Sequence, residues 1–265
     1  MIAPLSADSI SALCRPAAQQ VAIRVVAETG STNADLMAEV EHLGCPTFLV
    51  AEAQTAGKGR AGRAWHAIPG ATLTFSLAWK FNVPAQALLG MPLAVGVAVA
   101  GALAEFGIGV QLKWPNDILL GGRKLGGILI ESANAGAHIW AVIGIGINMQ
   151  VPEELARRIG QAAAAAPDLQ AQRERALASL LSHLAEALLQ FEQHGFAAFQ
   201  ARWNALHAYR DVEVDIVEQG RILQQGRAIG VDDSGRLLLA TPQGQVAVLA
   251  GDVSLRSQVQ ARQTS

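Results

Sequence analysis

The chain has 265 residues, a formal net charge of −2 and a hydrophobic fraction of 51%, with only 16% charged residues. This composition excludes a disordered or low-complexity chain, and the near-neutral charge argues against binding to DNA or an anionic membrane through overall charge. Two cysteines, Cys14 and Cys45, are too few for a disulfide framework and match no zinc spacing, which fits a reducing cytoplasm. The start of the chain has no pattern of a secretory signal.

Short strands and helices alternate along the first 150 residues. The first 20 residues read as a tail or a short helix. Alternation and β-branched residues predict a strand at 21–26, and capping residues in the turn at 28–33 open a predicted helix that runs to about residue 43. Further strands are predicted at 47–52, 72–79, 110–114, 118–120, 124–132 and 138–149, with hairpin-like turns at 121–123 and 133–137.

One apolar segment, residues 87–104, carries no charged or strongly polar side chain and approaches the length of a membrane span. It is richer in Ala, Gly and Val than in Leu and Phe, and Pro92 suits the first turn of a helix. Glu105 ends the apolar run. We therefore predict a buried helix that packs on a sheet, and no membrane partner.

Helical spacing returns in the second half of the chain. An apolar stripe predicts a helix that packs on the core, and it is formed by Leu177, Leu180, Leu181, Leu184, Leu188 and Phe191. A second helix is predicted at about 196–209. From residue 211 the pattern changes to short strands separated by turns, which is typical of a small all-β barrel. The predicted fold is α+β: a domain of residues 1–208 with a mixed β-sheet and helices, in which 1–20 form the tail, and a small domain at 209–265.

The loop at 54–70 concentrates glycine and positive charge. Residues 57–63, GKGRAGR, spell G-x-G-x-x-G, but a strand rather than a helix follows, and no Lys-Ser/Thr pair completes a Walker A sequence. Glycines let backbone N–H groups surround an anion, and Lys58, Arg60 and Arg63 supply positive charge. We predict an anion site, with an ordinary solvated basic loop as the alternative. These cations have no evident protein partner, so we expect the loop to be mobile until an anion binds.

A second polar cluster interrupts a predicted hairpin at 113–131. Lys113 and Lys124 lie on or beside apolar strands, close to Asn116 and Asp117. Because lysine is rarely buried unpaired, the segment predicts a functional site, with a structural ion pair of Lys113 and Asp117 as the alternative. The glycines at 126–127, inside a strand, predict the close approach of a ligand or another backbone.

Two weaker signals complete the pattern. Strand glycines precede Asn148 in the segment GIGIN, where the Asn148 amide can form two hydrogen bonds. The turn ETGSTN at 28–33, together with Gln54, gathers hydroxyl and amide groups at strand ends. Such a turn can equally be only a helix cap.

Together, these segments resemble the biotin protein ligases, also called biotin–acetyl-CoA-carboxylase ligases. ETGSTN, EAQTAGKGRAGRAW, KWPNDILL, RKLGGILIE and GIGINM follow the order and approximate spacing of that family, and the ending AGDVSLR is similar to that of its SH3-like domain. The resemblance covers about residues 23–257. It implies a catalytic domain of the class II aminoacyl-tRNA-synthetase-like type and a small C-terminal SH3-like β-barrel. It also implies that biotin and MgATP give biotinyl-5′-AMP and pyrophosphate, and that biotin then passes to a lysine of a biotin carboxyl carrier domain.

The resemblance further implies a role for individual residues. The implied catalytic residues are Lys124, Arg60, Lys113 and Asp117. The implied biotin site comprises Ser31, Thr32, Asn33, Gln54, Gly57, Lys58, Arg60, Lys124, Gly127 and Gly144. The implied nucleotide site comprises Arg60, Arg63, Trp65, Lys113, Asn116, Lys124 and Asn148. Asp117 either helps to accept a proton from the incoming lysine or holds Lys113. ATP and Mg²⁺ are the implied cofactors, and no protein metal ligand is implied.

The chain departs from the family pattern in two ways. Lys58 replaces the first loop arginine, which keeps the charge and loses the bidentate fork. About 20 residues precede the first strand, too few for the helix-turn-helix repressor domain of many bacterial relatives, so we expect no nucleic-acid partner. Relatives often dimerise through the catalytic sheet, and an open sheet edge can pair with its copy, so a homodimer is expected.

Other function classes stay open at this point. Lipoate- or octanoate-attaching enzymes share the catalytic fold, but the ETGSTN turn, Gln54 and the C-terminal barrel favour biotin. A non-catalytic module that binds a nucleotide or a carrier protein is a second alternative, against which Lys113, Arg60 and Lys124 argue.

Overall fold

Helices and strands occur in the predicted order. This computed structural model describes residues 4–135, 138–153, 156–157, 163–218, 220–251 and 253–257; the tip of the predicted turn at 133–137 and the chain after 257 lie outside these ranges. The helices are α1 (Ala7–Leu13), α2 (Thr32–Glu39), α3 (Met91–Ala104), α5 (Arg173–His194) and α6 (Ala197–Leu206). The strands are β1 (Ala22–Thr29), β2 (Thr47–Gln54), β3 (Thr72–Phe81), β4 (Gln111–Lys113), β5 (Asp117–Leu120), β6 (Arg123–Ala135), β7 (His138–Asn148), β8 (Glu213–Glu218), β9 (Arg221–Val231), β10 (Leu237–Thr241), β11 (Gly244–Val248) and β12 (Val253–Ser257).

Seven strands form one mixed sheet in the order β1-β2-β3-β7-β6-β5-β4. β1 and β2 are parallel, and each other neighbouring pair is antiparallel. The longest strands of this sheet, β3, β7 and β6, occupy its centre, and β1 and β4 form its two edges. The mixed sheet with helices confirms the predicted α+β class.

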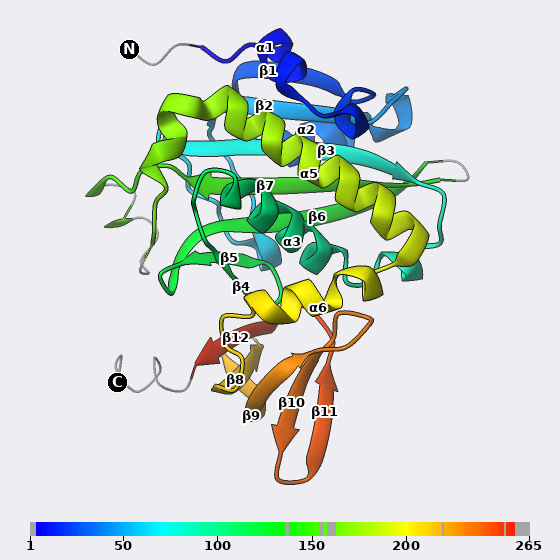
Figure 1. Ribbon diagram of the computed structural model, residues 1–265, viewed down its shortest axis with the longest axis vertical. Coiled ribbons are helices and arrows are strands. Elements are labelled where there is room, and N and C mark those ends of the chain that lie inside the picture. Colours follow the sequence, from blue (N-terminus) through cyan, green and yellow to red (C-terminus); the bar gives the residue numbers. More distant parts are fainter. Residues whose placement is uncertain are drawn as a thin grey trace.

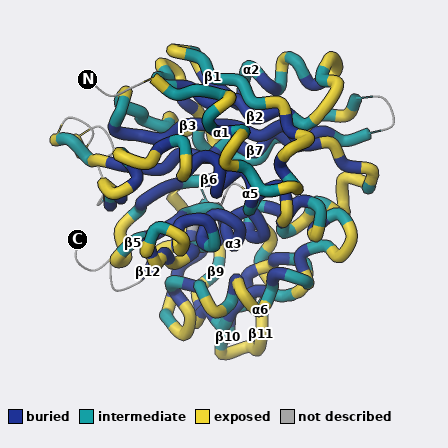
Figure 2. Tube along the Cα trace, turned by 45° about the horizontal axis from the view of Figure 1, so that its top comes forward, coloured by how far each residue is buried: buried dark blue, intermediate teal, exposed yellow. Residues whose placement is uncertain are grey.

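Both faces of this sheet carry buried apolar side chains. Successive side chains of a strand point to opposite faces, so neighbouring residues of one strand belong to different clusters. On β2, Phe48 and Val50 belong to the larger core cluster, whereas Leu49 belongs to a smaller cluster with Leu36 of α2. α3 and α5 cross the same face of the sheet (Figure 1) and pack against each other. Figure 2 shows that burial is concentrated in the central strands and in α3.

The apolar segment is a core helix, as predicted. A short 3₁₀ turn (Ala85–Leu88) leads into α3, and the most apolar 18 residues within 85–104 have a mean hydropathy of 2.1, which on length and composition alone would allow a membrane span. α3 instead packs against α5, α6 and β6, and most of its residues are buried. The helix therefore fills the space between the sheet and the outer helices.

Two helices cover this core from outside. All six residues of the predicted stripe on α5 are buried, which confirms that helix and its orientation. The first 20 residues were expected to form either a tail or a short helix, and the structure has the short helix α1. Ser6 caps α1, the Ile10 side chain is fully buried, and Arg15 pairs with Glu105 and Glu186.

The last five strands form an antiparallel sheet in the order β11-β10-β9-β8-β12, which confirms the predicted C-terminal β region. The register of β9 shifts against both β8 and β10, with one extra residue on β9 in each pair, which is the pattern of a β-bulge. Their buried residues Val214 and Leu239 join the larger core cluster, and Trp114 Nε1 donates a hydrogen bond to the Gly235 carbonyl oxygen. The domain boundary predicted between 208 and 209 falls between α6 and β8 and stays a prediction.

Candidate active site

One cavity of about 490 Å³ gathers most of the predicted site residues. It is lined by the start of α2, the end of β2, the loop at 54–70 and parts of β3, β6 and β7. Its predicted members are Ser31, Thr32, Asn33, Gln54, Lys58, Arg60, Arg63, Trp65, Asn116, Lys124, Gly127, Gly144 and Asn148. Gly57, Lys113 and Asp117 do not line the cavity. Residues from segments far apart in the sequence therefore form one site.

The polar end of the cavity consists of Ser31, Thr32, Asn33, Gln54 and Ser76. Gln54 Oε1, at the end of β2, accepts a hydrogen bond from Thr32 N (2.8 Å) and lies 3.0 Å from Thr32 Oγ1. Ser31 Oγ accepts from Ala34 N at 3.4 Å and so caps α2, which leaves its own hydroxyl hydrogen available to the cavity. The turn is thus both a helix cap and part of the cavity wall.

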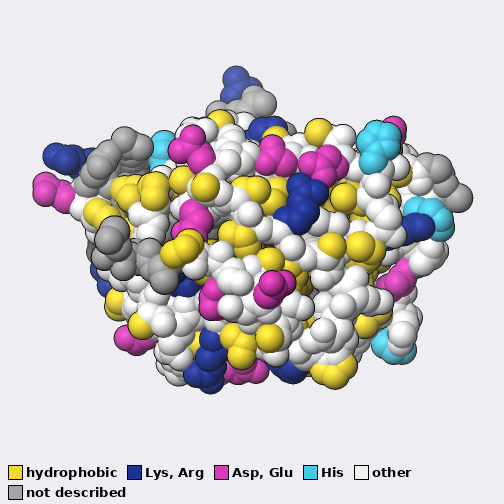
Figure 3. All heavy atoms as spheres, turned by 90° about the horizontal axis from the view of Figure 1, so that it is seen from above, with side chains coloured by type: hydrophobic (Ala, Val, Ile, Leu, Met, Phe, Trp, Pro, Cys, Tyr) yellow, Lys and Arg dark blue, Asp and Glu magenta, His cyan; other side chains and the backbone are white. Residues whose placement is uncertain are grey.

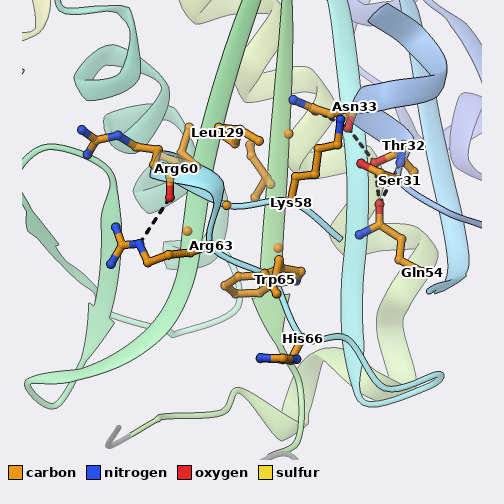
Figure 4. A pocket seen from close by; sticks show the side chains of 18 of the residues that line it. Ser31, Thr32, Asn33, Gln54, Lys58, Arg60, Arg63, Trp65, His66 and Leu129 are labelled. Carbon is orange, nitrogen blue, oxygen red and sulfur yellow. Dashed lines mark hydrogen bonds between the residues drawn. The ribbon is translucent and has the colours of Figure 1, made fainter. Parts of the chain in front are cut away.

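The cationic end of the cavity consists of Arg60, Arg63 and Lys124. Figure 4 shows Arg60 and Arg63 on the other side of Trp65 from Ser31, Thr32 and Gln54. Arg60 donates one hydrogen bond to Asn116 Oδ1 (2.9 Å) and another to the Gly251 carbonyl oxygen, and Arg63 Nε donates to the Arg60 carbonyl oxygen (3.2 Å). The expectation that the loop cations lack protein partners is therefore wrong for Arg60, because residues remote in sequence supply them.

Lys58 behaves differently from the two arginines. Its side chain extends across the cavity toward Asn33 in Figure 4, and its ammonium forms no hydrogen bond or ion pair within the described ranges of the chain. The loop in this structure lies over the cavity, and its mobility without an anion stays a prediction.

Three charged side chains form a row beside the cationic end. Asp117 lies between two lysines, with Oδ1 2.6 Å from Lys124 Nζ and Oδ2 4.0 Å from Lys113 Nζ. Burial lowers the pKa of Lys113, Asp117 opposes this shift, and the nearby charges of Lys124, Arg256 and Arg63 lower the pKa further. The ion pair offered as the structural alternative exists, but the closer partner of Asp117 is the cavity lysine.

Trp65 divides the cavity by lying against the main chain of β7. A side chain at Gly146 would overlap the indole ring, so only glycine allows this approach. Lys124 Nζ lies 6.0 Å from the indole centroid, within range of a cation–π interaction. The buried Trp65 Nε1 and Asn148 Oδ1 have no hydrogen-bond partner in the described part of the chain, while Asn148 Nδ2 donates to the Ala164 carbonyl oxygen (3.3 Å).

Other glycines also permit close approach, as the sequence predicted for strand positions. A side chain at Gly144 would overlap the Asn33 carboxamide, and one at Gly126 would overlap the Gly146 carbonyl oxygen. Gly57 faces Trp65 and Gln54 in the same way. Gly57 therefore shapes the loop around the cavity although it does not line it.

Sequence analysis missed several residues of the site. Ser76 and Phe75 of β3, His66 of the loop and Leu129 of β6 line the cavity, and Glu131 lies behind it as the acceptor for Asn33 Nδ2 (2.9 Å). A signal existed for Ser76, because the alternation of β3 places it on the same face as Thr72 and Thr74. Nothing in the sequence separates these three polar residues from one another.

The described residues offer no ready-made metal centre. No group of three or more His, Cys, Asp or Glu side chains within them could hold a metal ion. The carboxylates of Asp117 and Glu131, beside the cavity, are engaged by Lys124 and Asn33.

On the face shown in Figure 3, acidic and basic side chains lie close together, so that face presents no large surface of one charge.

Comparison with known proteins identifies the class. Residues 25–148 match the Biotin/lipoate A/B protein ligase family, and residues 212–256 match the Biotin protein ligase C terminal domain. The fold and the cavity thus define a member of the biotin and lipoate protein ligases.

The relatives narrow this class. The bifunctional ligase/repressor BirA of Escherichia coli (strain K12) is 34% identical over 239 residues, which cover 89% of this chain and 74% of BirA. The biotin–[acetyl-CoA-carboxylase] ligase of Mycobacterium tuberculosis is 38% identical over 243 residues, which cover 86% of this chain and 87% of the relative. The structure of the biotin protein ligase from Aquifex aeolicus in complex with biotin and ATP has 30% identity and a TM-score of 0.73, covering 89% of this chain and 99% of that one. The chain belongs to the biotin protein ligase family and is a biotin ligase enzyme.

Proposed function

We propose that the chain uses this single cavity to join biotin to AMP and then passes the biotinyl group to a lysine of the carboxyl carrier domain of acetyl-CoA carboxylase. The main support is the placement of a buried polar end and a cationic end in one cavity, on either side of Trp65. A reaction that joins a carboxylate to a phosphate needs this combination, because recognition and charge neutralisation must act on one small molecule.

The polar end holds the ureido ring of biotin. That ring offers one carbonyl acceptor between two N–H donors. Ser31 Oγ and Gln54 Nε2 can donate to the carbonyl oxygen, and Thr32 Oγ1 and Gln54 Oε1 can accept from the N–H groups. Asn33, Gly57, Gly127 and Gly144 shape this end, which is supported by the overlap that side chains would create at two of the three glycines, Gly57 and Gly144.

The cationic end stabilises the charge that develops during both steps. In the first step, a biotin carboxylate oxygen attacks the α-phosphorus of ATP, and pyrophosphate leaves with the electrons of the broken P–O bond. In the second step, the neutral amine of the carrier lysine attacks the acyl carbon, AMP leaves with the electrons of the broken C–O bond, and the proton that the nitrogen loses passes to solvent water. Lys124 contacts the carboxylate and the phosphate, and Arg60 and Arg63 bind phosphate oxygens, while Lys58 extends toward the end that holds biotin.

Asp117 positions the Lys124 ammonium. The 2.6 Å contact between the two side chains supports this role over one in which Asp117 holds only Lys113. Lys113 places a second positive charge behind the pair and addresses the ATP phosphates. Trp65 packs near adenine, while Asn116 and Asn148 bind the nucleotide; the unpartnered Asn148 Oδ1 supports this assignment.

Mg²⁺ enters this proposal as part of MgATP. The described residues contain no group of three or more acidic, His or Cys ligands, and phosphate oxygens together with water would coordinate the ion.

The chain also acts as a homodimer in a reducing cytoplasm. The edge strand β1 of the seven-stranded sheet supports dimerisation, and Cys14 and Cys45, which form no disulfide, support the compartment. Sedimentation with and without biotin and ATP tests the dimer, and a monomer under all conditions contradicts it.

The function itself is tested by its intermediate. The purified chain is incubated with MgATP and, in separate reactions, biotin or lipoate, and the products are analysed by mass spectrometry. Biotinyl-AMP is expected with biotin alone, followed by a single added biotin on the carrier domain when that domain is supplied. Lipoyl-AMP at a comparable level, or no acyl-adenylate at all, would overturn the proposal.

A further inference from the structure

A continuous row of hydrogen bonds leads from the polar end of the cavity to Glu131, outside it. Thr32 Oγ1 lies 2.7 Å from Ser76 Oγ, and Ser76 Oγ lies 2.6 Å from Asn33 Oδ1. Asn33 Nδ2 donates to Glu131 Oε2 at 2.9 Å. Thr32, Asn33 and Ser76 are buried, so water does not compete with these contacts.

The direction of this row is set by Glu131. A carboxylate only accepts hydrogen bonds, so the Asn33 carboxamide must turn its NH₂ group toward Glu131 and its oxygen toward Ser76. The Asn33 oxygen also only accepts, so the Ser76 hydroxyl must give its single hydrogen to Asn33. Ser76 Oγ is then left as an acceptor for Thr32.

A count of hydrogens shows what this direction does to the cavity. Thr32 and Ser76 have two hydroxyl hydrogens for three oxygen–oxygen contacts: Thr32 to Gln54 at 3.0 Å, Thr32 to Ser76 at 2.7 Å and Ser76 to Asn33 at 2.6 Å. The two shortest contacts take both hydrogens. Gln54 Oε1 then receives only the Thr32 backbone N–H, and Thr32 Oγ1 receives no hydrogen, so both oxygens keep acceptor capacity.

If the hydrogen bonds of the row ran in the opposite direction, the cavity would offer less acceptor capacity to a ligand N–H group. If the Asn33 carboxamide were reversed, its NH₂ group would donate to Ser76, Ser76 to Thr32 and Thr32 to Gln54. All three contacts would then be satisfied inside the protein, and Gln54 Oε1 would already hold two hydrogen bonds. The charge of Glu131 therefore keeps the empty cavity short of donors.

We propose that Glu131, acting through Asn33 and Ser76, reserves acceptor capacity on Thr32 and Gln54 for the two N–H groups of the substrate ring. Glu131 and Ser76 are thus positioning residues that determine specificity for a ring with N–H donors. This inference rests on the proposed function and adds a residue outside the cavity to it. The Lys58 ammonium, directed toward this end in Figure 4, is the kind of donor that such an acceptor-rich site attracts.

Glu131→Gln tests the proposal without changing the shape of the cavity. A glutamine no longer forces the Asn33 carboxamide into one orientation, so the fully satisfied reverse direction becomes available. The matched control is Glu192→Gln, because Glu192 accepts hydrogen bonds from Asn82, also an asparagine, away from the cavity. Affinity is measured by titration calorimetry for biotin, for ATP and for two lactam isosteres of biotin, in each of which CH₂ replaces one ring N–H.

The expected result is selective. Glu131→Gln weakens biotin binding about tenfold, leaves ATP binding unchanged and reduces by about tenfold the preference for biotin over the isosteres, whereas Glu192→Gln changes none of these. An unchanged affinity and preference in Glu131→Gln would overturn the inference, and so would equal losses for biotin and ATP. A wild-type chain that binds no biotin would instead overturn the proposed function, and this inference with it.

A second pair of variants separates the row of hydrogen bonds from general packing. Ser76→Ala removes the middle of the row, and Thr74→Val removes a buried hydroxyl from the same face of β3, where Thr74 Oγ1 donates to the Ala51 carbonyl oxygen (3.0 Å). Ser76→Ala is expected to lose the preference for biotin over the isosteres as Glu131→Gln does, while Thr74→Val keeps it. Equal behaviour of these two variants would contradict a role for Ser76 in specificity.

Discussion

The two ends of the cavity are built in opposite ways. At the polar end, buried hydroxyl and amide groups bond to one another before any ligand arrives. At the cationic end, Arg60 donates hydrogen bonds to the Asn116 side chain and to a main-chain carbonyl oxygen, and Lys124 forms an ion pair with Asp117. A ligand meets a preorganised wall of neutral polar groups at one end, whereas at the other it meets side chains whose positive charge it neutralises. Recognition and chemistry are therefore expected to fail separately.

The largest effect is expected at the cationic end. Lys124→Ala removes a charge that acts on the transition state, and such a loss lowers the rate about 10²–10³-fold. Biotin-dependent ATP–pyrophosphate exchange measures this step, and circular dichroism checks the fold. Exchange close to the wild-type rate would show that the charge of Lys124 does not act in the chemical step.

The polar end should affect binding without affecting chemistry. Thr32→Val removes the hydroxyl that contacts both Gln54 Oε1 and Ser76 Oγ, so the cavity loses one acceptor and Ser76 Oγ loses its donor. We expect the KM for biotin to rise about tenfold to a hundredfold, with the KM for ATP and kcat little changed. A parallel rise in both KM values would remove the distinction between the two ends.

His207, which lies outside both ends of the cavity, is expected to make the stability of the fold depend on pH. His207 is buried against Trp203, neither ring nitrogen has a partner in the described part of the chain, and burial lowers its pKa to about 4. In the unfolded chain His207 has its ordinary pKa of 6.5, so it binds a proton below pH 6.5, whereas in the folded protein it stays neutral down to about pH 4. The free energy of unfolding therefore falls as the pH drops from 6.5 toward 4.

His207→Phe should remove this dependence. Urea unfolding at pH 7.5 and pH 5 is expected to differ by about 2 kcal/mol less in the variant than in the wild type. Biotin affinity at pH 7.5 should be unchanged, because His207 does not line the cavity. An identical pH dependence in both proteins would show that His207 is not buried in its neutral form.

The smallest effect concerns retention of the intermediate. Arg60→Gly removes the guanidinium that spans the loop and Gly251, so the adenylate should escape and label about fivefold more bystander protein per adenylate formed. Biotin blotting of added albumin measures this, with Arg60→Lys expected to fall between the two. If Arg60→Gly still makes adenylate and labels no more albumin than the wild type, the loop does not retain the intermediate.

Local patterns in the sequence account for much of the fold. Alternation found the central strands, spacing found α5, and the small residues of α3 distinguished a core helix from a membrane span. These features depend on neighbouring residues, and so they can be predicted from short windows. In the cavity, the close approach of strand glycines was predicted at Gly126 and Gly144.

What sequence analysis missed depends on contacts between distant segments. Arg60 and Gly251 are 191 positions apart, and no periodicity relates them. Ser76 was indistinguishable from Thr72 and Thr74 until α2 was placed above β3. The family resemblance named the residues of the site, but the partner of each one follows only from the tertiary arrangement.

The contact between Arg60 and Gly251 has an evolutionary consequence. The acceptor is a main-chain oxygen, so no substitution of the side chain at 251 can delete it directly, and only backbone rearrangement or a change at Arg60 can. Side-chain substitutions at residues 249–251 therefore leave this hydrogen bond in place. Among descendants of this chain, these residues can diverge in composition while the position of the main chain at 251 remains under selection.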